Sequence, residues 1–331
     1  MDKITRASVL AFITAFTTLF MQVLIHRIVS VKLLNNYAFL IISLTMLGFA
    51  ISGTVLTGWV DKFIKFRDDV TVTCAALFCL CLLGITMMFY GTDFGSQHSS
   101  SLSKLALFTL LNAAPFVFCG LILGVLLSSP DLRTGRIYFC DLVGSSAGAF
   151  AVIPCVSAIG VEYSLIIVCM MFIIGAAFVM QPVKKALVYP LSVISVAVLL
   201  IAAVFHNDTF RMRYPVDSML DQVQKAGPEY GIDYTQWDPL SRIELSRIPP
   251  PTTDMSSYPS LIGGNEEFHK RFRRLITQNN FAFTYAVDYD GTKESIKGIE
   301  ETIYASAYQA TSVKNPQVAI IGVGGGFDIL T

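Results

Sequence analysis

The sequence predicts a polytopic α-helical membrane domain followed by an incomplete α/β domain. Three observations support this fold class. The chain is 53% apolar and 15% charged, with a mean hydropathy of +0.60, whereas soluble proteins carry about 25% charged residues. Charge is also unevenly distributed, because residues 1–205 hold 12 Lys and Arg and 8 Asp and Glu, while residues 206–331 hold 12 and 16. Finally, a glycine-rich turn, GVGGGFD, stands near the C-terminus.

Seven apolar stretches within residues 1–205 could each cross a bilayer, which takes roughly 17–25 residues. The first stretch is too long for a secretory signal peptide and has no small-residue cleavage site after it. We therefore expect a multi-pass protein of the cell membrane, with the lipid bilayer as partner of its first domain. The expected spans are 9–29, 37–59, 70–90, 105–127, 137–159, 163–180 and 186–205.

Basic residues between these stretches fall unequally on the two sides, nine with the N-terminus and five opposite, which predicts a cytoplasmic N-terminus. Seven spans would then place the tail outside, where nucleotide-derived cofactors are not kept. Three explanations stay open: the fifth stretch, interrupted by Asp141 and Pro154, does not cross; the charge rule does not apply; or the tail uses no such cofactor. The nine are Lys3, Arg6, Lys62, Lys65, Arg67, Arg133, Arg136, Lys184 and Lys185, and the five are Arg27, Lys32, Lys104, Arg211 and Arg213.

Small and polar residues inside the spans predict how the helices pack and where a buried charge needs a partner. The glycine pairs Gly120/Gly124 and Gly144/Gly148 have the small-xxx-small spacing that lets helix backbones approach closely in lipid. Asp141 needs a partner, because a charge at the membrane centre costs about 2.5–3.5 kcal/mol. It would mark either a substrate or proton path, or an ion pair with Arg136 or Arg27.

All seven cysteines lie in the expected spans, and none shares a metal-ligand spacing with histidine. We therefore expect them to be apolar packing residues, and we expect no metal site. They are Cys74, Cys79, Cys81, Cys119, Cys140, Cys155 and Cys169.

The tail, residues 206–331, has the composition of a soluble α/β domain. The segment WDPLSRIEL (237–245) predicts a turn and then a strand, while FAFTYAVDYDG (281–291) predicts an edge strand that ends in an Asp-Gly turn. Arg242, at the start of the first of these strands, would bind a carboxylate of cofactor or substrate, or form a structural ion pair.

Two helices are expected in the tail. One lies within EEFHKRFRRLITQ (266–278), where apolar residues have helical spacing. Its basic residues would form a solvated face or contact anionic headgroups; nucleic-acid binding is not expected, because the tail has more acidic than basic residues. The other covers 294–311, capped by Thr292 and stopped by Asn315-Pro316. The first helix would bury Phe268, Phe272, Leu275 and Ile276 and expose Lys270, Arg271, Arg273 and Arg274.

A strand over 318–321 is expected to lead into the glycine turn. Gly322, Gly324 and Gly326 permit positive φ and leave no Cβ between backbone and ligand. We take these three glycines, with Gly325 and Asp328, as the candidate cofactor-binding residues. The dinucleotide pattern G-x-G-x-x-G would need glycine where Phe327 stands, which favours an adenosyl-methionine-type site. The alternative is a purely structural turn.

These motifs also carry a family resemblance. WDPLSRI (237–243) followed by VAIIGVGGGFD (318–328), after a multi-span region, resembles the membrane-anchored spermidine synthase-like proteins. Within the spans, MQVLIHRIVSV (21–31), LGFAISG (47–53) and YFCDLVGSSAGA (138–149) are similar to patterns of that family. The resemblance implies a class I methyltransferase-like, Rossmann-like fold for the tail, with Gly322, Gly324 and Gly326 lining an adenosyl-cofactor pocket.

The resemblance implies transfer of an aminopropyl or methyl group from S-adenosylmethionine or its decarboxylated form. The substrate-binding part is dissimilar: ETIYASAYQ (301–309) stands where soluble aminopropyltransferases have an acidic-Tyr-His-Glu run, and Ser241 or Arg242 where they have glutamine. A ribose-binding acidic residue and a catalytic aspartate would lie beyond Thr331. We therefore expect a piece of a longer protein that is inactive alone, and no catalytic residue, acceptor substrate or oligomeric state can be named. The alternative is a non-enzymatic transporter or scaffold with a degenerate Rossmann-like tail.

Overall fold

A computed structural model describes residues 2–33, 35–92, 95–96, 99–100, 102–216, 218–238, 241–249, 263, 266–280, 282–313 and 316–330. The chain divides into two compact units. We call Met1–Val216 with Trp237–Leu240 the helical unit, and Asp217–Gln236 with Ser241–Thr331 the tail unit.

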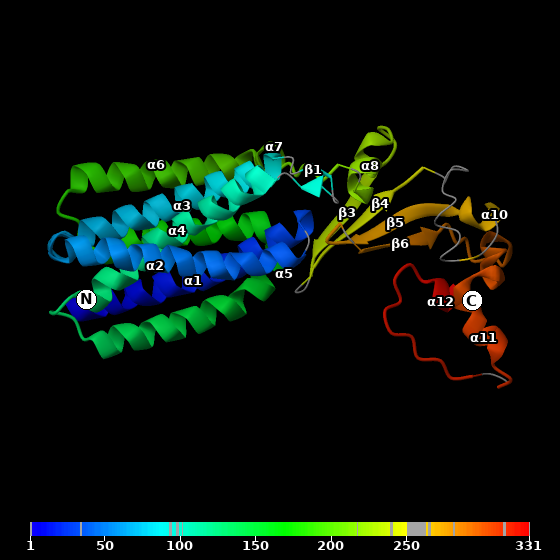
Figure 1. The fold of residues 1–331 in the computed structure, drawn as a ribbon, viewed down its shortest axis with the longest axis horizontal. Coiled ribbons are helices and arrows are strands. Elements are labelled where there is room, and N and C mark those ends of the chain that lie inside the picture. Colours follow the sequence, from blue (N-terminus) through cyan, green and yellow to red (C-terminus); the bar gives the residue numbers. More distant parts are fainter. Residues whose placement is uncertain are drawn as a thin grey trace. The chain divides into compact units, whose positions relative to one another are not determined.

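Six helices of the helical unit are long and apolar enough to cross a membrane, and they lie alongside one another (Figure 1). The expected α-helical membrane-type domain is confirmed to this extent. A two-residue hairpin, β1 (Gly95–Ser96) with β2 (Ser99–Ser100), precedes the fourth helix, and a single turn, α7 (His206–Thr209), follows the sixth. The six are α1 (Lys3–Lys32), α2 (Asn35–Lys65), α3 (Arg67–Gly91), α4 (Leu102–Ser128), α5 (Thr134–Val179) and α6 (Lys185–Val204).

The fifth and sixth apolar stretches share α5, which folds back on itself at Gly160. This residue has φ 80° and ψ 172°, a combination that only glycine adopts readily. A Cβ on Gly144 would lie 2.4 Å from the Phe12 carbonyl oxygen, and one on Gly175 would lie 3.2 Å from Ile13. A straight helix would separate those two glycines by about 46 Å at 1.5 Å per residue. Both halves of α5 therefore lie against the same part of α1.

Glycine allows the closest helix contacts of the unit. A Cβ on Gly148 would lie 2.3 Å from the Phe16 carbonyl oxygen, so α1 and the first half of α5 touch backbone to backbone. Between α2 and α4, a Cβ on Gly120 would lie 2.2 Å from Ser52 Oγ, and one on Gly124 would lie 2.9 Å from Leu56. The close packing expected for both glycine pairs is confirmed.

The outer faces of the helices are apolar. Phe150, Phe178 and Val204 are 78%, 88% and 78% exposed, an arrangement suited to lipid rather than to water. All seven cysteines are free thiols, four of them buried and three partly buried, as expected for packing residues. Asp141 makes no ion pair among the described residues, so the expected partners Arg136 and Arg27 are not observed.

Charged residues gather at both ends of the bundle. At one end, Lys3 and Arg67 both pair with Asp131 in the α4–α5 connection, with Arg67 Nη1 3.1 Å from Asp131 Oδ1. At the same end, the Lys184 amide donates to Asp69 Oδ1 at 2.9 Å. Lys32 and Arg213 instead both bond to the Tyr90 carbonyl oxygen, at the C-terminus of α3. Lys3, Arg67 and Lys184 therefore make contacts at one end, and Lys32 and Arg213 at the other.

The tail unit is built on a four-stranded sheet of order β3-β4-β5-β6. Its strands are β3 (Gly231–Trp237), β4 (Arg242–Arg247), β5 (Phe272–Gln278) and β6 (Ala282–Val287). β4 pairs antiparallel with β5 in the register Leu245↔Ile276, and β5 pairs antiparallel with β6 in the register Leu275↔Tyr285. The strand expected within 237–245 is confirmed as β4, which runs on to Arg247, and the edge strand expected within 281–291 is confirmed as β6.

Short helical elements complete the tail unit. They are α8 (Met219–Lys225), α10 (Glu266–His269), three 3₁₀ turns η1 (Glu294–Ile296), η2 (Ile299–Glu301) and η3 (Ile303–Ala305), α11 (Ser306–Ala310) and α12 (Phe327–Leu330).

The helix expected over 266–278 is wrong. Only α10 is helical there, residues 270–271 form a turn, and β5 occupies the rest. The pairing of β5 with β6 shifts register between Phe272 and Arg274, which is a β-bulge, and a bulge adds one residue to the alternation of a strand. Phe272, Leu275 and Thr277 are consequently the buried positions. The spacing of three between the first two imitates a helical pattern.

The single helix expected over 294–311 is also wrong. Gly298, with φ 95°, separates η1 from η2, and Thr302, extended at φ −87° and ψ 161°, separates η2 from η3. Thr292 does act as a cap, because its Oγ1 accepts from the Ser295 amide at 3.3 Å, but it caps the 3₁₀ turn η1. Asn315 lies outside the described residues.

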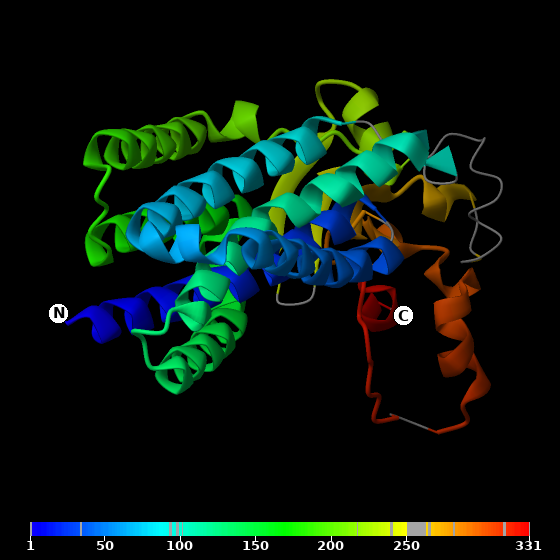
Figure 2. The ribbon, with the colours of Figure 1, turned by 60° about the vertical axis from the view of Figure 1, so that its left-hand side comes forward.

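The strand expected over 318–321 is not formed, and the tail unit shows no Rossmann fold in its described residues. Val318 is 53% exposed and Ile321 is 99% exposed. No described strand pairs with this segment, and a strand is stable only as a member of a hydrogen-bonded ladder. Residues from Pro316 onward instead run as an open chain that returns to α12 (Figure 2).

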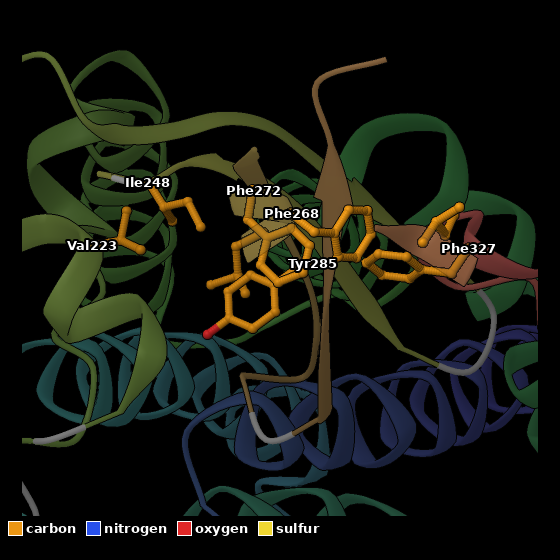
Figure 3. Packing of buried hydrophobic residues seen from close by; sticks show 8 residues of the cluster. Val223, Ile248, Phe268, Phe272, Tyr285 and Phe327 are labelled. Carbon is orange, nitrogen blue, oxygen red and sulfur yellow. The ribbon is translucent and has the colours of Figure 1, made fainter. Parts of the chain in front are cut away.

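An aromatic cluster forms the core of the tail unit (Figure 3). Phe272 stacks on Tyr285 with ring centroids 5.0 Å apart, and Phe268 meets Phe272 edge to face at 5.5 Å. Phe327 stacks on Tyr304 at 5.1 Å. The core therefore joins β5 and the edge strand β6 to α12, directly after the glycine turn.

Candidate functional site

The glycine turn is the candidate site that the sequence predicts. Gly322, Gly324 and Gly326 have φ values of 78°, 55° and 84°, in the region that side chains with a Cβ rarely adopt. Nothing lies within 4 Å of a Cβ built on Gly322 or Gly326. Two glycines therefore present open backbone, while all three require the conformational freedom of glycine.

Gly325 has a different role, because it is the contact between the turn and the sheet. A Cβ there would lie 1.8 Å from the Tyr285 carbonyl oxygen of β6. A Cβ on Gly324 would meet Thr284 at 3.5 Å. Gly325 thus permits close backbone contact with the edge strand, and the expectation of a structural role holds for this one glycine.

The residues after the turn fix its position. Phe327 is 2% exposed within the aromatic core, and Tyr308 Oη donates to the Asp328 carbonyl oxygen at 2.8 Å. The Gly326 amide donates to the Val323 carbonyl oxygen at 3.0 Å, which closes the turn. The Phe327 side chain therefore packs in the aromatic core and does not line the turn.

Arg242 does not carry a free guanidinium. Its Nε lies 3.0 Å from Glu244 Oε1, and Thr277 Oγ1 donates to Glu244 Oε2 at 3.0 Å. The Glu244 carboxylate is fully buried, so it needs these partners. Of the two roles expected for Arg242, the structural ion pair is the one observed.

The basic residues of 270–274 are divided between a turn and β5. Arg274 pairs with Asp233 of β3, which also receives Arg247 Nε at 2.8 Å, and Arg271 donates to the Glu294 carbonyl oxygen. They therefore do not form one solvated helix face. Ion pairing across three strands accounts for Arg274 of β5, which shares Asp233 with Arg247 of β4.

Sequence reasoning missed a polar cluster in the helical unit. Lys32 Nζ donates to the carbonyl oxygens of Phe89, Tyr90 and Thr92 at 2.5, 3.0 and 2.5 Å. Tyr90 Oη in turn donates to Glu162 Oε1 at 2.5 Å, beside the reversal of α5. The signal was available, because Lys32 and Glu162 each adjoin an apolar stretch, but their spacing in the chain gave no reason to join them.

The described residues contain no group of three or more His, Cys, Asp or Glu side chains able to hold a metal ion. The fold and these sites define a class: a helical protein with apolar helices long enough to cross a membrane, carrying a small tail built on an antiparallel sheet. Comparison with protein-family models, with curated proteins and with solved structures gave no match for this sequence.

Proposed function

We propose that the protein is a membrane-bound, spermidine synthase-like transferase whose glycine turn forms part of the binding site for an adenosyl-sulfonium donor. One observation carries the proposal. Three of the five residues from Gly322 to Gly326 have positive φ, and two of them have open space where a side chain would stand. Bare backbone of this kind lets a cofactor lie against amide groups.

The chemistry follows from the charge on the donor. A nucleophile, such as an amine, attacks the carbon attached to the positively charged sulfur. The new bond forms as the carbon–sulfur bond breaks, sulfur leaves as a neutral thioether, and a base takes the proton that the amine loses. Most of the rate acceleration would come from holding the two reactants in line.

The proposal requires the tail to lie on the side of the membrane where the donor is available. We call the end of the helical unit that carries Lys3, Arg67 and Lys184 the lysine-rich end. This end is cytoplasmic under the positive-inside rule. The last residues of α6 lie at the opposite end, where the His206 ring stacks on the Tyr163 ring with centroids 4.4 Å apart. A donor made in the cytosol must nevertheless reach the tail. Protease treatment of intact cells tests this: protection of the tail supports a cytosolic donor, and cleavage from outside contradicts it.

Calorimetric titration of the purified protein with S-adenosylmethionine, its decarboxylated form and methylthioadenosine tests donor binding directly. We expect heat from at least one of them, and about tenfold weaker binding, or 1.4 kcal/mol, in the Gly322→Ala variant. Gly291→Ala is the matched control, because Gly291 also has positive φ and open space around its Cβ position. No heat from any ligand, or equal losses in both variants, would contradict the proposal.

A second candidate is a non-enzymatic transporter or scaffold. The polar cluster of Lys32, Tyr90 and Glu162 supports it, because buried polar groups within helical membrane proteins often mark substrate paths. The absence of a described strand at 318–321 also favours a degenerate tail. Donor binding by the tail, in the titration above, is the result that excludes this candidate.

A further inference from the structure

A cavity of about 470 Å³ lies at the lysine-rich end of the helical unit, between the ends of α2, α3 and α6. This volume falls within the roughly 300–1,000 Å³ of small-molecule sites. Aromatic and aliphatic side chains form most of its wall, including Trp59, Phe63, Phe66 and Leu187. Lys62 and Lys184 also line it. An apolar interior with cationic side chains suits an amphiphile that carries an anionic group.

The backbone of α2 bends at this cavity. Trp59 has φ −140° and ψ 26°, outside the helical region, and its ring meets Phe63 edge to face at 6.4 Å. The ring is 63% exposed, although a tryptophan in a soluble core would be covered. Tryptophan with one apolar and one polar side is favoured at the membrane–water interface, which places the cavity at headgroup level.

Both lysines that line the cavity have exposed side chains, and neither ammonium makes an ion pair within the described part of the chain. The Lys184 ammonium lies 5.0 Å from the centre of the Phe66 ring, a contact that holds it beside the apolar wall. Asp69 is the acidic side chain among the lining residues, and its Oδ1 accepts from the Lys184 amide at 2.9 Å. The carboxylate therefore fixes the loop before α6.

From this arrangement we infer that the cavity binds an anionic phospholipid of the surrounding leaflet. Its phosphate lies between the ammonium groups of Lys62 and Lys184, and an acyl chain lies along Trp59, Phe63 and Leu187. A bilayer lipid, rather than a soluble anion, is the occupant because the apolar wall continues onto exposed apolar side chains: Leu187 is 69% exposed and Val183 is 79% exposed. Lysines at headgroup level attract anionic lipids over zwitterionic ones.

Tryptophan fluorescence offers a direct test, since the chain contains two tryptophans and Trp237→Phe leaves Trp59 as the reporter. The variant is reconstituted in phosphatidylcholine bilayers containing a small fraction of brominated phosphatidylglycerol or of brominated phosphatidylcholine. We expect the anionic lipid to quench Trp59 more strongly. The preference should fall about fivefold for each lysine removed, so Lys62→Gln with Lys184→Gln should abolish it.

The matched control is Lys65→Gln with Lys185→Gln, which removes the same charge from neighbouring residues that do not line the cavity. It should keep the preference for phosphatidylglycerol. Equal quenching by the two lipids, or equal loss in both double variants, would overturn the inference. Displacement of the quenching lipid by inorganic phosphate alone would show that the site takes soluble anions instead.

Native mass spectrometry of the unsubstituted protein gives a second measurement. After delipidation, one phosphatidylglycerol should remain bound, and it should be lost from the Lys62→Gln, Lys184→Gln variant but not from the control. Neither measurement depends on the tail or on its proposed donor, so both can succeed or fail independently of the proposed transferase function.

Discussion

Lys32, the last residue of α1, donates a hydrogen bond of 2.5 Å to the carbonyl oxygen of Phe89 in the last turn of α3. The same ammonium also bonds to the carbonyl oxygens of Tyr90 and Thr92. The last carbonyls of a helix have no partners within it, and they carry the negative end of its dipole. A lysine from one helix therefore completes the C-terminus of another.

Replacing Lys32 by methionine tests this contact. Methionine is apolar and slightly shorter than lysine, so the carbonyl groups of Phe89 and Thr92 lose this donor, while that of Tyr90 keeps the Arg213 amide. We expect a loss of about 3 kcal/mol in unfolding free energy. The measurement is the thermal unfolding midpoint of the purified protein in detergent. Lys185→Met, at an exposed lysine, is the control and should leave the midpoint nearly unchanged. Equal midpoints for the two variants would contradict a stabilising role for Lys32.

The backbone contact between α1 and α5 predicts a strong effect of one methyl group. A Cβ at Gly148 would lie 2.3 Å from the Phe16 carbonyl oxygen, so Gly148→Ala should force the helices apart at a cost of about 1–3 kcal/mol. Gly53→Ala is the control, since nothing lies within 4 Å of its Cβ position. The control should be neutral or stabilising by up to about 1 kcal/mol. Chemical denaturation in mixed micelles compares the two, and the prediction fails if Gly148→Ala behaves like the control.

In the tail unit, Gly325→Ala should detach the glycine turn from β6. The new methyl group would overlap the Tyr285 carbonyl oxygen, only 1.8 Å from the Cβ position. We expect faster amide hydrogen exchange in residues 322–330 and easier proteolysis there, with little change in the helical unit. Gly231→Ala has open space around its Cβ position and serves as the control. Unchanged exchange in Gly325→Ala would show that the turn does not depend on this contact.

Asp131 predicts a pH dependence of the helical unit. A hydrogen bond from Lys3 and the nearby charge of Arg67 hold the pKa of its carboxyl below the ordinary value. Stability from a carboxylate with a lowered pKa is fully present above the unfolded pKa, near 4, and is lost as pH falls through the folded pKa. Because the side chain is 37% exposed, solvent screening limits this contribution to less than about 1 kcal/mol.

The thermal midpoint, measured as pH falls from 6 toward 3, should therefore decline less steeply in Asp131→Asn than in the unsubstituted protein. Asp61→Asn is the control, because no ion pair of Asp61 occurs among the described residues. Parallel curves for all three proteins would argue against the contribution of Asp131.

The helical unit was largely predictable because lipid imposes one simple requirement. Each apolar stretch had to satisfy its own backbone hydrogen bonds, and every one of them is helical. What the stretches could not reveal was that Gly160 joins two of them into one reversing helix. A single glycine has no distinguishing pattern in the sequence, whereas its φ of 80° is evident once the chain is folded.

The tail unit was harder to predict because its elements depend on their neighbours. The spacing of Phe268, Phe272 and Leu275 fitted a helix, but the bulge in β5 produces similar spacing in a strand. The apolar segment 318–321 was expected to be a strand, yet pairing rather than composition decides this. The strands β4 and β6 were foreseen from their apolar and β-branched residues. The glycines of the turn were foreseen as well, because positive φ at Gly322, Gly324 and Gly326 depends mainly on the residues themselves.

The backbone contact between α1 and α5 has a consequence for how the protein is made. α1 is synthesised before α2, α3 and α4, and α5, which it contacts backbone to backbone, only after them. Until then, the backbone at Phe12 and Phe16, against which Gly144 and Gly148 pack in the finished bundle, has no α5 to cover it. The nascent first helix therefore depends on a helix made much later, or on a membrane chaperone, to cover this face.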